Sequence, residues 1–380
     1  MNCKQVVVYS CGDSNLLSTW SNVPYLFCQA LEKQGVRVHR VNIEPLSWLN
    51  KFYNRISYAI FCRLLRLRSC PVYGRSWFHR YLTKRKIRRI SRKYRDIDFH
   101  LFLTYAFRNE YSCKPSILWC DWSDAIVIER LGRKVAWYER LWINYETKVI
   151  QKADVVYSMF PVCAKHMSEM YSREICWLKR NVINTVEDSR IELDDIISGR
   201  LARCSILFIG GTLYTGACQQ LIEAFRKLRK RFQEIELNII GQVEESYGGD
   251  MRGIRFFGYL HKDVECEKNL YYSLLKQAHL FVNPSPQWGG YSSTVEAMYY
   301  GCPILISPYE DFTTEFGNEI SFGDYLRGQP LDVAIEKLMQ TSEEKYKEMC
   351  IMAHQAVKDY SWKQYVNFFL DDLRKRGIYA

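Results

Sequence analysis

Short apolar runs rich in β-branched residues alternate with longer helical runs along both halves of the chain. Near the N-terminus, the apolar run "KQVVVYSC" is followed by the helical run "YLFCQALEKQG" and then by a second apolar run, "VRVHRVNI". The second half repeats this order and begins with "SILFIGG", "QQLIEAFRKLRKRF" and "IELNIIG". Strands that alternate with helices form parallel sheets, which bind ligands beyond the carboxyl ends of their strands. The sequence therefore predicts an α/β fold with two doubly wound parallel sheets.

The length of the chain also favours two domains. Its 380 residues are too many for one ordinary core and suit two domains of roughly 180 residues each. The polar stretch "NTVEDSRIELDD" separates the two series of strands and helices. Because domain boundaries fall in exposed polar segments, we place the boundary at residues 186–203.

The stretch "PSPQWGGYSSTVEAMYYGCPILISP" joins a predicted strand to a predicted helix. Gly289 and Gly290 let the backbone approach a ligand closely, and free amides at the start of the helix favour a phosphate group. Glu296 would lie one turn into that helix, where a carboxylate can accept hydrogen bonds from two ribose hydroxyls. The loop therefore predicts a nucleotide-diphosphate site. We also expect that the fold itself needs no charge at Glu296. The alternative is a tight turn in which Glu296 only complements the helix dipole.

This stretch resembles the donor-site motif of GT-B glycosyltransferases, especially the retaining enzymes of glycosyltransferase family 4 (group 1). Gly301, Cys302 and Pro303 match the Gly-x-Pro with which that motif ends. The segment "LFIGGTLYTGACQQLIEAFRKLRKRFQEIELNIIG" is similar to the family's first strand, glycine loop, helix and second strand, and "RFFGYL" is similar to its base-proximal strand. The resemblance covers most of residues 204–376 and is vaguer before them.

The resemblance implies a GT-B fold, in which two Rossmann-like domains face a cleft. It implies an acceptor-binding domain at 1–195, a nucleotide-sugar-binding domain at 196–360 and a C-terminal helix at 361–380 that returns to the first domain. The implied reaction moves a sugar from a nucleotide-diphosphate sugar to a hydroxyl of a lipid-linked or glycan acceptor, in surface polysaccharide or glycolipid biosynthesis. It retains the donor's configuration and uses no metal or other cofactor. The residues that the resemblance assigns to the donor are Gly210, Gly211, Thr212, Thr215, Gly289, Gly290, Tyr291, Ser292, Ser293, Thr294 and Glu296.

The chain departs from the family pattern at the places that hold the sugar and the diphosphate. Trp288 stands where the family has a first Glu, and Thr212 and Thr215 occupy the glycine loop that usually carries an Arg and a Lys. A catalytically decayed protein that only binds sugar nucleotides is therefore an alternative, and a nucleotide-sugar epimerase with the same double fold is another. The pattern "GGYSSTVEA" also resembles inverting GT-B families, so both stereochemical outcomes stay open.

Two carboxylates in "ILWCDWSD" are the candidates for acceptor chemistry. Asp121 and Asp124 follow a predicted strand of the first domain, where a carboxylate could orient or deprotonate the acceptor hydroxyl. The alternative is that each only caps the helix that follows. The Asp-x-Asp formed by Asp96 and Asp98 is far in sequence from the donor loops, so we predict no metal site.

The formal net charge of +11 comes from one segment, residues 47–95. It lies within the stretch from Glu44 to Asp96 that has no acidic residue between its ends and contains fifteen lysines and arginines. Apolar residues recur there at four-residue spacing, which predicts one stripe along a helix. The stripe consists of Trp48, Phe52, Ile56, Ile60 and Leu64, with a weaker continuation at Ile87, Ile90 and Tyr94.

We expect this basic segment to dock on an anionic membrane surface, since a merely soluble face usually mixes charges of both signs. The alternatives are an apolar stripe that faces the core and arginines that form a solvated face. A nucleic-acid-binding protein is a further alternative, but no nucleic-acid motif occurs, and we expect no nucleic-acid partner.

The N-terminal sequence and the cysteines bear on the compartment. The start "MNCKQVVVYSCGDSN" has too short an apolar run for a signal peptide, and no window holds the roughly 18 apolar residues of a spanning helix. The fourteen cysteines include no C-x-x-C pair, so we expect reduced thiols. These features predict a cytoplasmic protein, peripheral on the inner face of the membrane.

Overall fold

The structure, a computed structural model, describes residues 4–67, 69–178, 180–187, 191–201, 204–286 and 291–379. The chain divides into two units, one of residues 1–180 with 365–380 and one of residues 181–364. The boundary after residue 180 lies closer to the N-terminus than the predicted boundary after residue 195. The reason is that the segment after it bonds to the second unit: Ile183 donates its backbone N–H to Tyr360, and Val186 donates to the Tyr272 hydroxyl.

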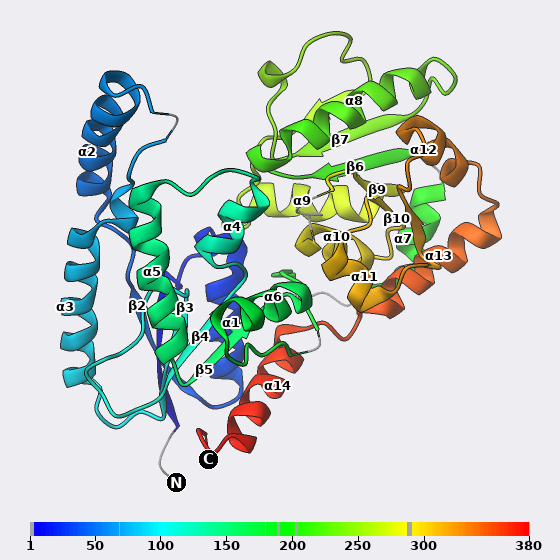
Figure 1. Cartoon of the computed structure of the whole chain (residues 1–380). Coiled ribbons are helices and arrows are strands. Elements are labelled where there is room, and N and C mark those ends of the chain that lie inside the picture. The colour runs from blue at the N-terminus through cyan, green and yellow to red at the C-terminus, as the bar shows by residue number, and fades with distance from the viewer. Residues whose placement is uncertain are drawn as a thin grey trace. The chain divides into compact units, whose positions relative to one another are not determined.

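The first unit is built on a five-stranded parallel sheet of order β2-β1-β3-β4-β5 (Figure 1). Its strands are β1 (Gln5–Ser10), β2 (Arg37–Asn42), β3 (Phe99–Leu103), β4 (Ser116–Cys120) and β5 (Val155–Ser158). Its helices are α1 (Val23–Lys33), α2 (Ser47–Ser57) with the π-helical turns Tyr58–Leu64 that continue it, α3 (Trp77–Lys93), α4 (Asp124–Arg130), α5 (Trp137–Lys152), α6 (Pro161–Tyr171) and, from Tyr365 onwards, α14 (Trp362–Lys375). Strand β3 is apolar at four of five positions and buried throughout, as expected for a parallel strand covered by helices on both faces.

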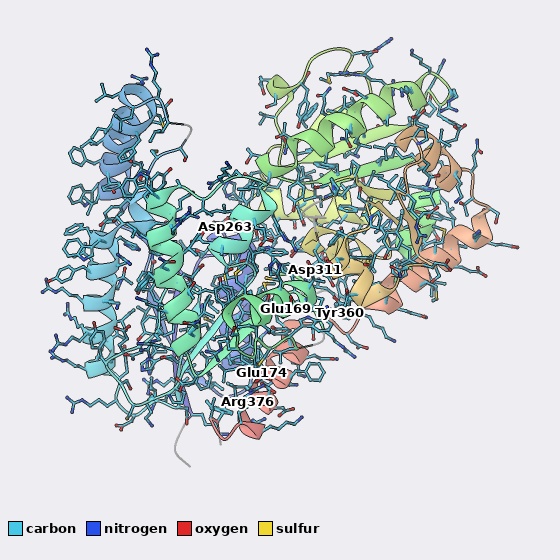
Figure 2. The ribbon with its side chains drawn as sticks, in the orientation of Figure 1. Glu169, Glu174, Asp263, Asp311, Tyr360 and Arg376 are labelled. Atoms are coloured by element: carbon cyan, nitrogen blue, oxygen red, sulfur yellow. The ribbon has the colours of Figure 1, made fainter. Side chains whose placement is uncertain are left out.

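The C-terminal helix α14 packs on the first unit. The Trp119 indole N–H donates to the Tyr365 hydroxyl at 2.7 Å, and the ring of Phe369 packs edge to face against Phe27 of α1. Beyond the helix, Arg376 forms an ion pair of 2.9 Å with Glu174, and Figure 2 labels both residues. The last residues of the chain therefore belong to the hydrophobic core and the surface of the first unit.

The second unit is built on a six-stranded parallel sheet of order β11-β10-β9-β6-β7-β8. Its strands are β6 (Ser205–Ile209), β7 (Glu236–Ile240), β8 (Ile254–Phe256), β9 (Leu280–Asn283), β10 (Ile304–Ile306) and β11 (Gly323–Tyr325). Its helices are α7 (Leu193–Leu201), α8 (Thr215–Arg229), α9 (Glu265–Gln277), α10 (Tyr291–Tyr299), α11 (Glu310–Phe316), α12 (Leu331–Met339) and α13 (Glu343–Val357). Two parallel α/β sheets confirm the predicted fold class.

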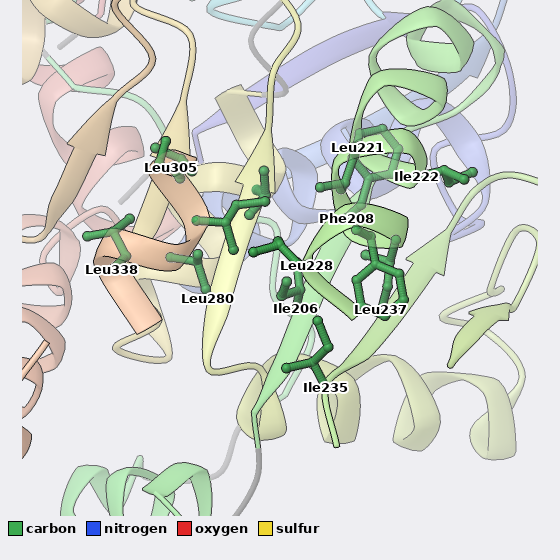
Figure 3. Close-up of a cluster of buried hydrophobic side chains, with 14 of the residues drawn as sticks. Ile206, Phe208, Leu221, Ile222, Leu228, Ile235, Leu237, Leu280, Leu305 and Leu338 are labelled. Atoms are coloured by element: carbon green, nitrogen blue, oxygen red, sulfur yellow. The ribbon is translucent and has the colours of Figure 1, made fainter. Parts of the chain in front are cut away.

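The core of the second unit lies between its sheet and the helices α8 and α12 (Figure 3). Leu221 and Leu228 of α8 are fully buried against strand residues such as Ile206 and Leu237. Leu338 of α12 joins the same cluster. The layer between the sheet and these two helices is thus made of apolar side chains, packed as protein interiors are.

One buried arginine forms hydrogen bonds that connect three helices of the second unit. Arg200, in the last turn of α7, has no exposed surface. Its guanidinium donates to the carbonyl oxygens of Leu275 at 3.0 Å and Lys276 at 2.9 Å, which end α9, and of Tyr300 at 2.9 Å and Gly301 at 2.6 Å, which follow α10. A cation at helix C-termini satisfies carbonyls that have no partner within their own helix and opposes the helix dipoles.

Candidate functional site

The strand order of the second unit reverses between β6 and β9. Strands β7 and β8 lie on one side of β6, and β9, β10 and β11 lie on the other. Parallel sheets of this kind bind ligands at the reversal, beyond the carboxyl ends of the strands. The loop after β6 begins at Gly210 and the loop after β9 begins at Pro284, so the structure brings the two loops predicted for the donor to the same edge.

The loop after β6 is held by residues that follow the neighbouring strand β7. The Gln242 side-chain amide donates to the carbonyl oxygen of Gly210 at 2.7 Å and to that of Gly211. Gly241 has a φ of +92°, and a Cβ there would lie 2.6 Å from the Gly210 carbonyl oxygen, so only glycine fits. A Cβ on Gly211, in contrast, would meet no atom of the described chain within 4 Å. The backbone of Gly211 is therefore open to the close approach of another group.

Thr212 and Thr215 lie where this loop enters α8. Thr212 begins a 3₁₀ turn, and α8 begins at Thr215. The Thr215 hydroxyl donates to the carbonyl oxygen of Thr212 at 2.9 Å and lies 3.3 Å from Oε1 of Gln242. The two threonines shape the turn that places the first amides of α8 beside the glycine loop, and such amides favour an anion.

The loop after β9 contains Gly289 and Gly290. These two residues and Trp288 lie outside the described part of the chain. The described chain resumes at Tyr291, which begins α10 and whose ring packs edge to face against Tyr309 and Phe312.

The hydroxyl residues of α10 differ in burial. Ser292 and Ser293 are half-buried in its first turn, whereas Thr294 is fully buried. Only the two serines therefore retain exposed surface at the start of the helix.

Glu296 is buried and carries two fixed partners. Its side chain is 4% exposed. Oε1 accepts a hydrogen bond from the Lys262 ammonium at 2.8 Å, and Oε2 accepts one from the Tyr271 hydroxyl at 2.7 Å. Burial and the adjacent Glu296 carboxylate raise the pKa of Tyr271 well above its usual value, so this phenol stays protonated and donates.

The prediction that the fold needs no charge at Glu296 is wrong. The Lys262 side chain is only 10% exposed, and its other contacts include the Asn184 carbonyl oxygen at 3.2 Å and the face of the Tyr271 ring at 4.2 Å. Removing the carboxylate would leave this cation nearly buried and without its ion-pair partner, which is costly in a low-dielectric site. Glu296 therefore stabilises the fold whatever else it binds.

Asp121 lies directly after β4 in the first unit. Its Oδ1 accepts hydrogen bonds from the Trp122 backbone N–H at 2.8 Å and from the Cys120 thiol at 3.2 Å. Burial raises the pKa of this carboxyl group above its usual value. A carboxyl group at the carboxyl end of a parallel strand can take up or release a proton of a bound ligand.

Asp124 begins α4, but it is not the cap of that helix. The cap is Ser123, whose hydroxyl accepts from the Ile126 backbone N–H at 3.5 Å. The two carboxylate oxygens of Asp124 accept instead from the Arg75 guanidinium and from the Trp142 indole N–H. The capping alternative is therefore wrong for Asp124, whose carboxylate joins the basic segment to α5.

Known structures share this two-domain architecture. Alpha,alpha-trehalose 6-phosphate synthase from Burkholderia multivorans has a TM-score of 0.65 at 8% identity, with 99% of each chain covered. WaaG, a glycosyltransferase involved in lipopolysaccharide biosynthesis, has a TM-score of 0.59 at 13% identity, with 95% of this chain and 98% of that chain covered. A putative UDP-N-acetylglucosamine 2-epimerase from Listeria monocytogenes has a TM-score of 0.55 at 13% identity, with 99% and 98% covered. At such identities the likeness establishes the GT-B fold alone.

The sequence of the second unit distinguishes among these activities. The family model of glycosyl transferases group 1 matches residues 203–319, which include the glycine loop, Lys262 and Glu296. This chain is a glycosyltransferase of the GT-B fold. Among curated proteins, none matches the glycosyltransferase in sequence.

Several residues that build the glycosyltransferase's candidate site were not predicted. Gln242 and Lys262 could have been found, because each follows the carboxyl end of a predicted strand by a few residues. Tyr271, Arg75 and Glu146 carried no such signal. Glu146 is buried in α5 and accepts from the Asp124 backbone N–H at 3.0 Å, and burial, followed by the nearby Asp124 carboxylate, raises its pKa well above the usual value.

Proposed function

We propose that this glycosyltransferase takes a sugar from a nucleotide-diphosphate sugar and transfers it to a hydroxyl of a lipid-linked or glycan acceptor. The observation that carries the proposal is Glu296, a buried carboxylate fixed by Lys262 and Tyr271 in the second turn of α10, within the group 1 domain. Each carboxylate oxygen accepts one of these hydrogen bonds and has a second lone pair for a ribose hydroxyl.

The diphosphate would lie at the start of α8 and α10. The open backbone at Gly211 and the first-turn amides of α8 favour an anion there, as do the half-buried Ser292 and Ser293. Because the described glycine loop has no Arg or Lys, these amides and hydroxyls would stabilise the nucleotide that leaves. Retention of configuration is the outcome that the resemblance to family 4 supports.

A thermal-shift screen tests the donor assignment. The full chain is heated with a panel of UDP-, GDP-, ADP- and CMP-linked sugars. A ligand at 100 times its Kd stabilises the folded state by about 2.7 kcal/mol, which raises the melting temperature measurably. We expect one nucleotide class to do so, with the sugar-free nucleotide giving a smaller shift. A panel with no shift at millimolar concentration would contradict the donor site.

Asp121 is the acceptor-side carboxylate that we assign to proton transfer. An Asp121→Asn variant keeps the size of the side chain and removes its basicity, so we expect kcat to fall about 100-fold while donor affinity is unchanged. Since the pKa of Asp121 is raised, the wild-type kcat should fall on acidification at a higher pH than an ordinary aspartate would give.

The exposed Asp359 supplies the control, because Asp359→Asn changes the same group outside both candidate sites. Transfer at the wild-type rate in Asp121→Asn would contradict the assignment. If Asp124→Asn alone abolished transfer, Asp124 would be the reacting carboxylate.

We propose further that the basic segment docks on an anionic membrane surface. All five residues of the predicted stripe are exposed, from 43% for Ile60 to 76% for Leu64. The alternative of a stripe that faces the core is wrong for α2 and the turns after it, whereas on α3 Ile87 is fully buried and Ile90 and Tyr94 are half-buried. Among the described residues, no helix has both the length and the apolar character that a membrane crossing requires.

Liposome co-sedimentation tests this docking with a variant in which six exposed cations of α3 become Gln. These are Arg85, Lys86, Arg88, Arg89, Arg92 and Lys93. Each cation near an anionic bilayer contributes about 1 kcal/mol, so the bound fraction should fall at least about tenfold at low salt.

A matched variant changes six exposed cations outside residues 47–95 to Gln and should sediment like the wild type. These are Lys345, Lys347, Lys358, Lys363, Arg374 and Lys375. Equal sedimentation of both variants, or binding of the wild type to neutral vesicles, would exclude electrostatic docking.

A further inference from the structure

The first domain contains a cavity of about 290 Å³ that the predicted site does not use. It lies where the turns after α2, the start of α3 and the start of α5 meet, and Figure 1 shows α3 and α5 side by side. Its wall is mostly aromatic and aliphatic, including Phe61, Val72 and Trp142. Its charged residues are two cations, Arg75 and Arg80, and the Glu139 carboxylate, which is paired with Arg133. A cavity of this composition suits a slender apolar ligand with an anionic end.

The mouth of this cavity is unusually apolar for a protein surface. Trp77 is 69% exposed, Trp137 is 64% exposed and Leu141 is 61% exposed, and all three line the cavity. Exposed tryptophans of this kind are typical of side chains that lie at a membrane–water interface. The mouth is therefore suited to open onto a bilayer rather than onto water.

The two arginines differ in what they contact. Arg75 pairs with Asp124 and lies 3.9 Å from Glu139. The Arg80 guanidinium lies 4.5 Å from the centre of the Tyr145 ring and, within the described part of the chain, has no acidic partner. Arg80 is thus available to an anionic group at one end of a bound ligand.

Two residues of the cavity wall form hydrogen bonds to Asp124, one of the two carboxylates predicted to act on the acceptor. Arg75 and Trp142, which line the cavity, donate to the two carboxylate oxygens of Asp124. An occupant that moved either side chain would change the position of Asp124. A ligand in the cavity would therefore contact two hydrogen-bond partners of Asp124.

We propose that this cavity binds the apolar chain of an anionic membrane lipid, with the lipid's charged group at Arg80. The proposal deepens the proposed function, on which it rests, by naming an amphiphilic lipid as the acceptor class. Three features favour a lipid chain over a peptide or a nucleic acid: the aromatic and aliphatic wall, the exposed tryptophans at the mouth, and the surrounding segment without acidic residues.

Alkylation of Cys70, which lines the cavity, gives a site-resolved test. The full chain is treated with iodoacetamide, and the alkylation rate of each cysteine is followed by peptide mass spectrometry. The probe is monomeric lysophosphatidylglycerol below its critical micelle concentration, so no bilayer can shield the surface. We expect alkylation of Cys70 to slow at least fivefold, while the exposed Cys266 of the second domain reacts at an unchanged rate. Glycerophosphoglycerol, which is the headgroup without a chain, should give no protection.

Val72→Trp fills the cavity and should abolish the protection of Cys70. Val264→Trp is the matched control, because Val264 is similarly exposed in the second domain, and it should leave the protection unchanged. Leu141→Gln removes apolar surface from an exposed position at the mouth without demand on folding, and it should weaken protection at a given lipid concentration.

Several results would overturn the proposal. They are a Cys70 rate that the lipid does not change, equal protection by the headgroup alone, and full protection in both Val72→Trp and Leu141→Gln. None of these measurements uses a sugar nucleotide. Protection of Cys70 without any thermal shift by sugar nucleotides would therefore contradict the donor assignment and leave the lipid cavity standing, and the reverse outcome would contradict only the cavity.

Discussion

An Arg200→Met variant should lose about 3 kcal/mol of stability in the second domain. Methionine fills a similar volume but donates no hydrogen bond, so four carbonyl oxygens at the ends of α9 and α10 lose their shared partner. The cation that opposes both helix dipoles is lost at the same time. For a domain of this size, the melting temperature should fall by roughly 10 °C, which calorimetry or circular dichroism can measure.

The ranking of two further variants separates this role from a general effect of losing charge. Arg200→Lys keeps the charge, but one ammonium cannot reach all four carbonyls, so its melting temperature should lie between those of the wild type and Arg200→Met. Arg252→Met removes an arginine whose ion pair with Asp250 lies on the surface, and it should melt like the wild type. Equal melting of Arg200→Met and Arg252→Met would contradict the role of Arg200 as the tie between helices.

The fold was largely predictable because short runs of apolar and β-branched residues mark most of its strands, and longer helical runs mark most of its helices. The runs that gave β6 and β7 are apolar and β-branched, which is how strands covered by helices on both faces read in a sequence. The expected helical run "QQLIEAFRKLRKRF" forms most of α8, Thr215–Arg229. The three-residue strand β11 at the sheet edge was not predicted, since so short a run carries almost no periodicity.

The candidate site was predictable only in part, because its contacts join residues far apart in sequence. The loop after β9 indicated Glu296, but its partners Tyr271 and Lys262 lie 25 and 34 residues away. Arg75 likewise meets Asp124 across 49 residues. Residue spacing within one loop can suggest a carboxylate, whereas only the assembled sheet fixes what that carboxylate contacts.

In the basic segment, the sequence did not predict which side of each helix faces the core. The four-residue spacing of Trp48 and Phe52 predicts an apolar stripe whether the stripe faces a core or solvent. The charge of the segment does not tell a core-facing stripe from a solvent-facing one. Both parts of the segment are basic, yet Ile87 of α3 is buried and Leu64 is exposed. The orientation of a helix depends on what its neighbours cover, which no short window contains.

A Glu296→Gln variant should lower kcat/KM for the nucleotide-sugar donor by at least about tenfold, a loss of about 1.4 kcal/mol. The amide keeps the shape of the side chain and one acceptor oxygen for Lys262, but it cannot accept from two ribose hydroxyls while it also accepts from Tyr271. Steady-state kinetics with the donor identified by thermal shift give the measurement. Glu296→Ala is the poorer test, because it also removes the oxygen that accepts from Lys262 and should lower the melting temperature further than Glu296→Gln does.

Two variants separate the donor contact from the stability of the Lys262–Glu296 pair. Tyr271→Phe removes one hydrogen bond to Oε2 and keeps the charge, so it should lower kcat/KM less than Glu296→Gln does. The exposed Glu234→Gln changes the same chemical group elsewhere in the second domain and should leave both kinetics and melting unchanged. If Glu296→Gln lowered the melting temperature but turned over donor at the wild-type rate, Glu296 would be a purely structural partner of Lys262. The ribose would then have to bind elsewhere along the edge where β6 and β9 end.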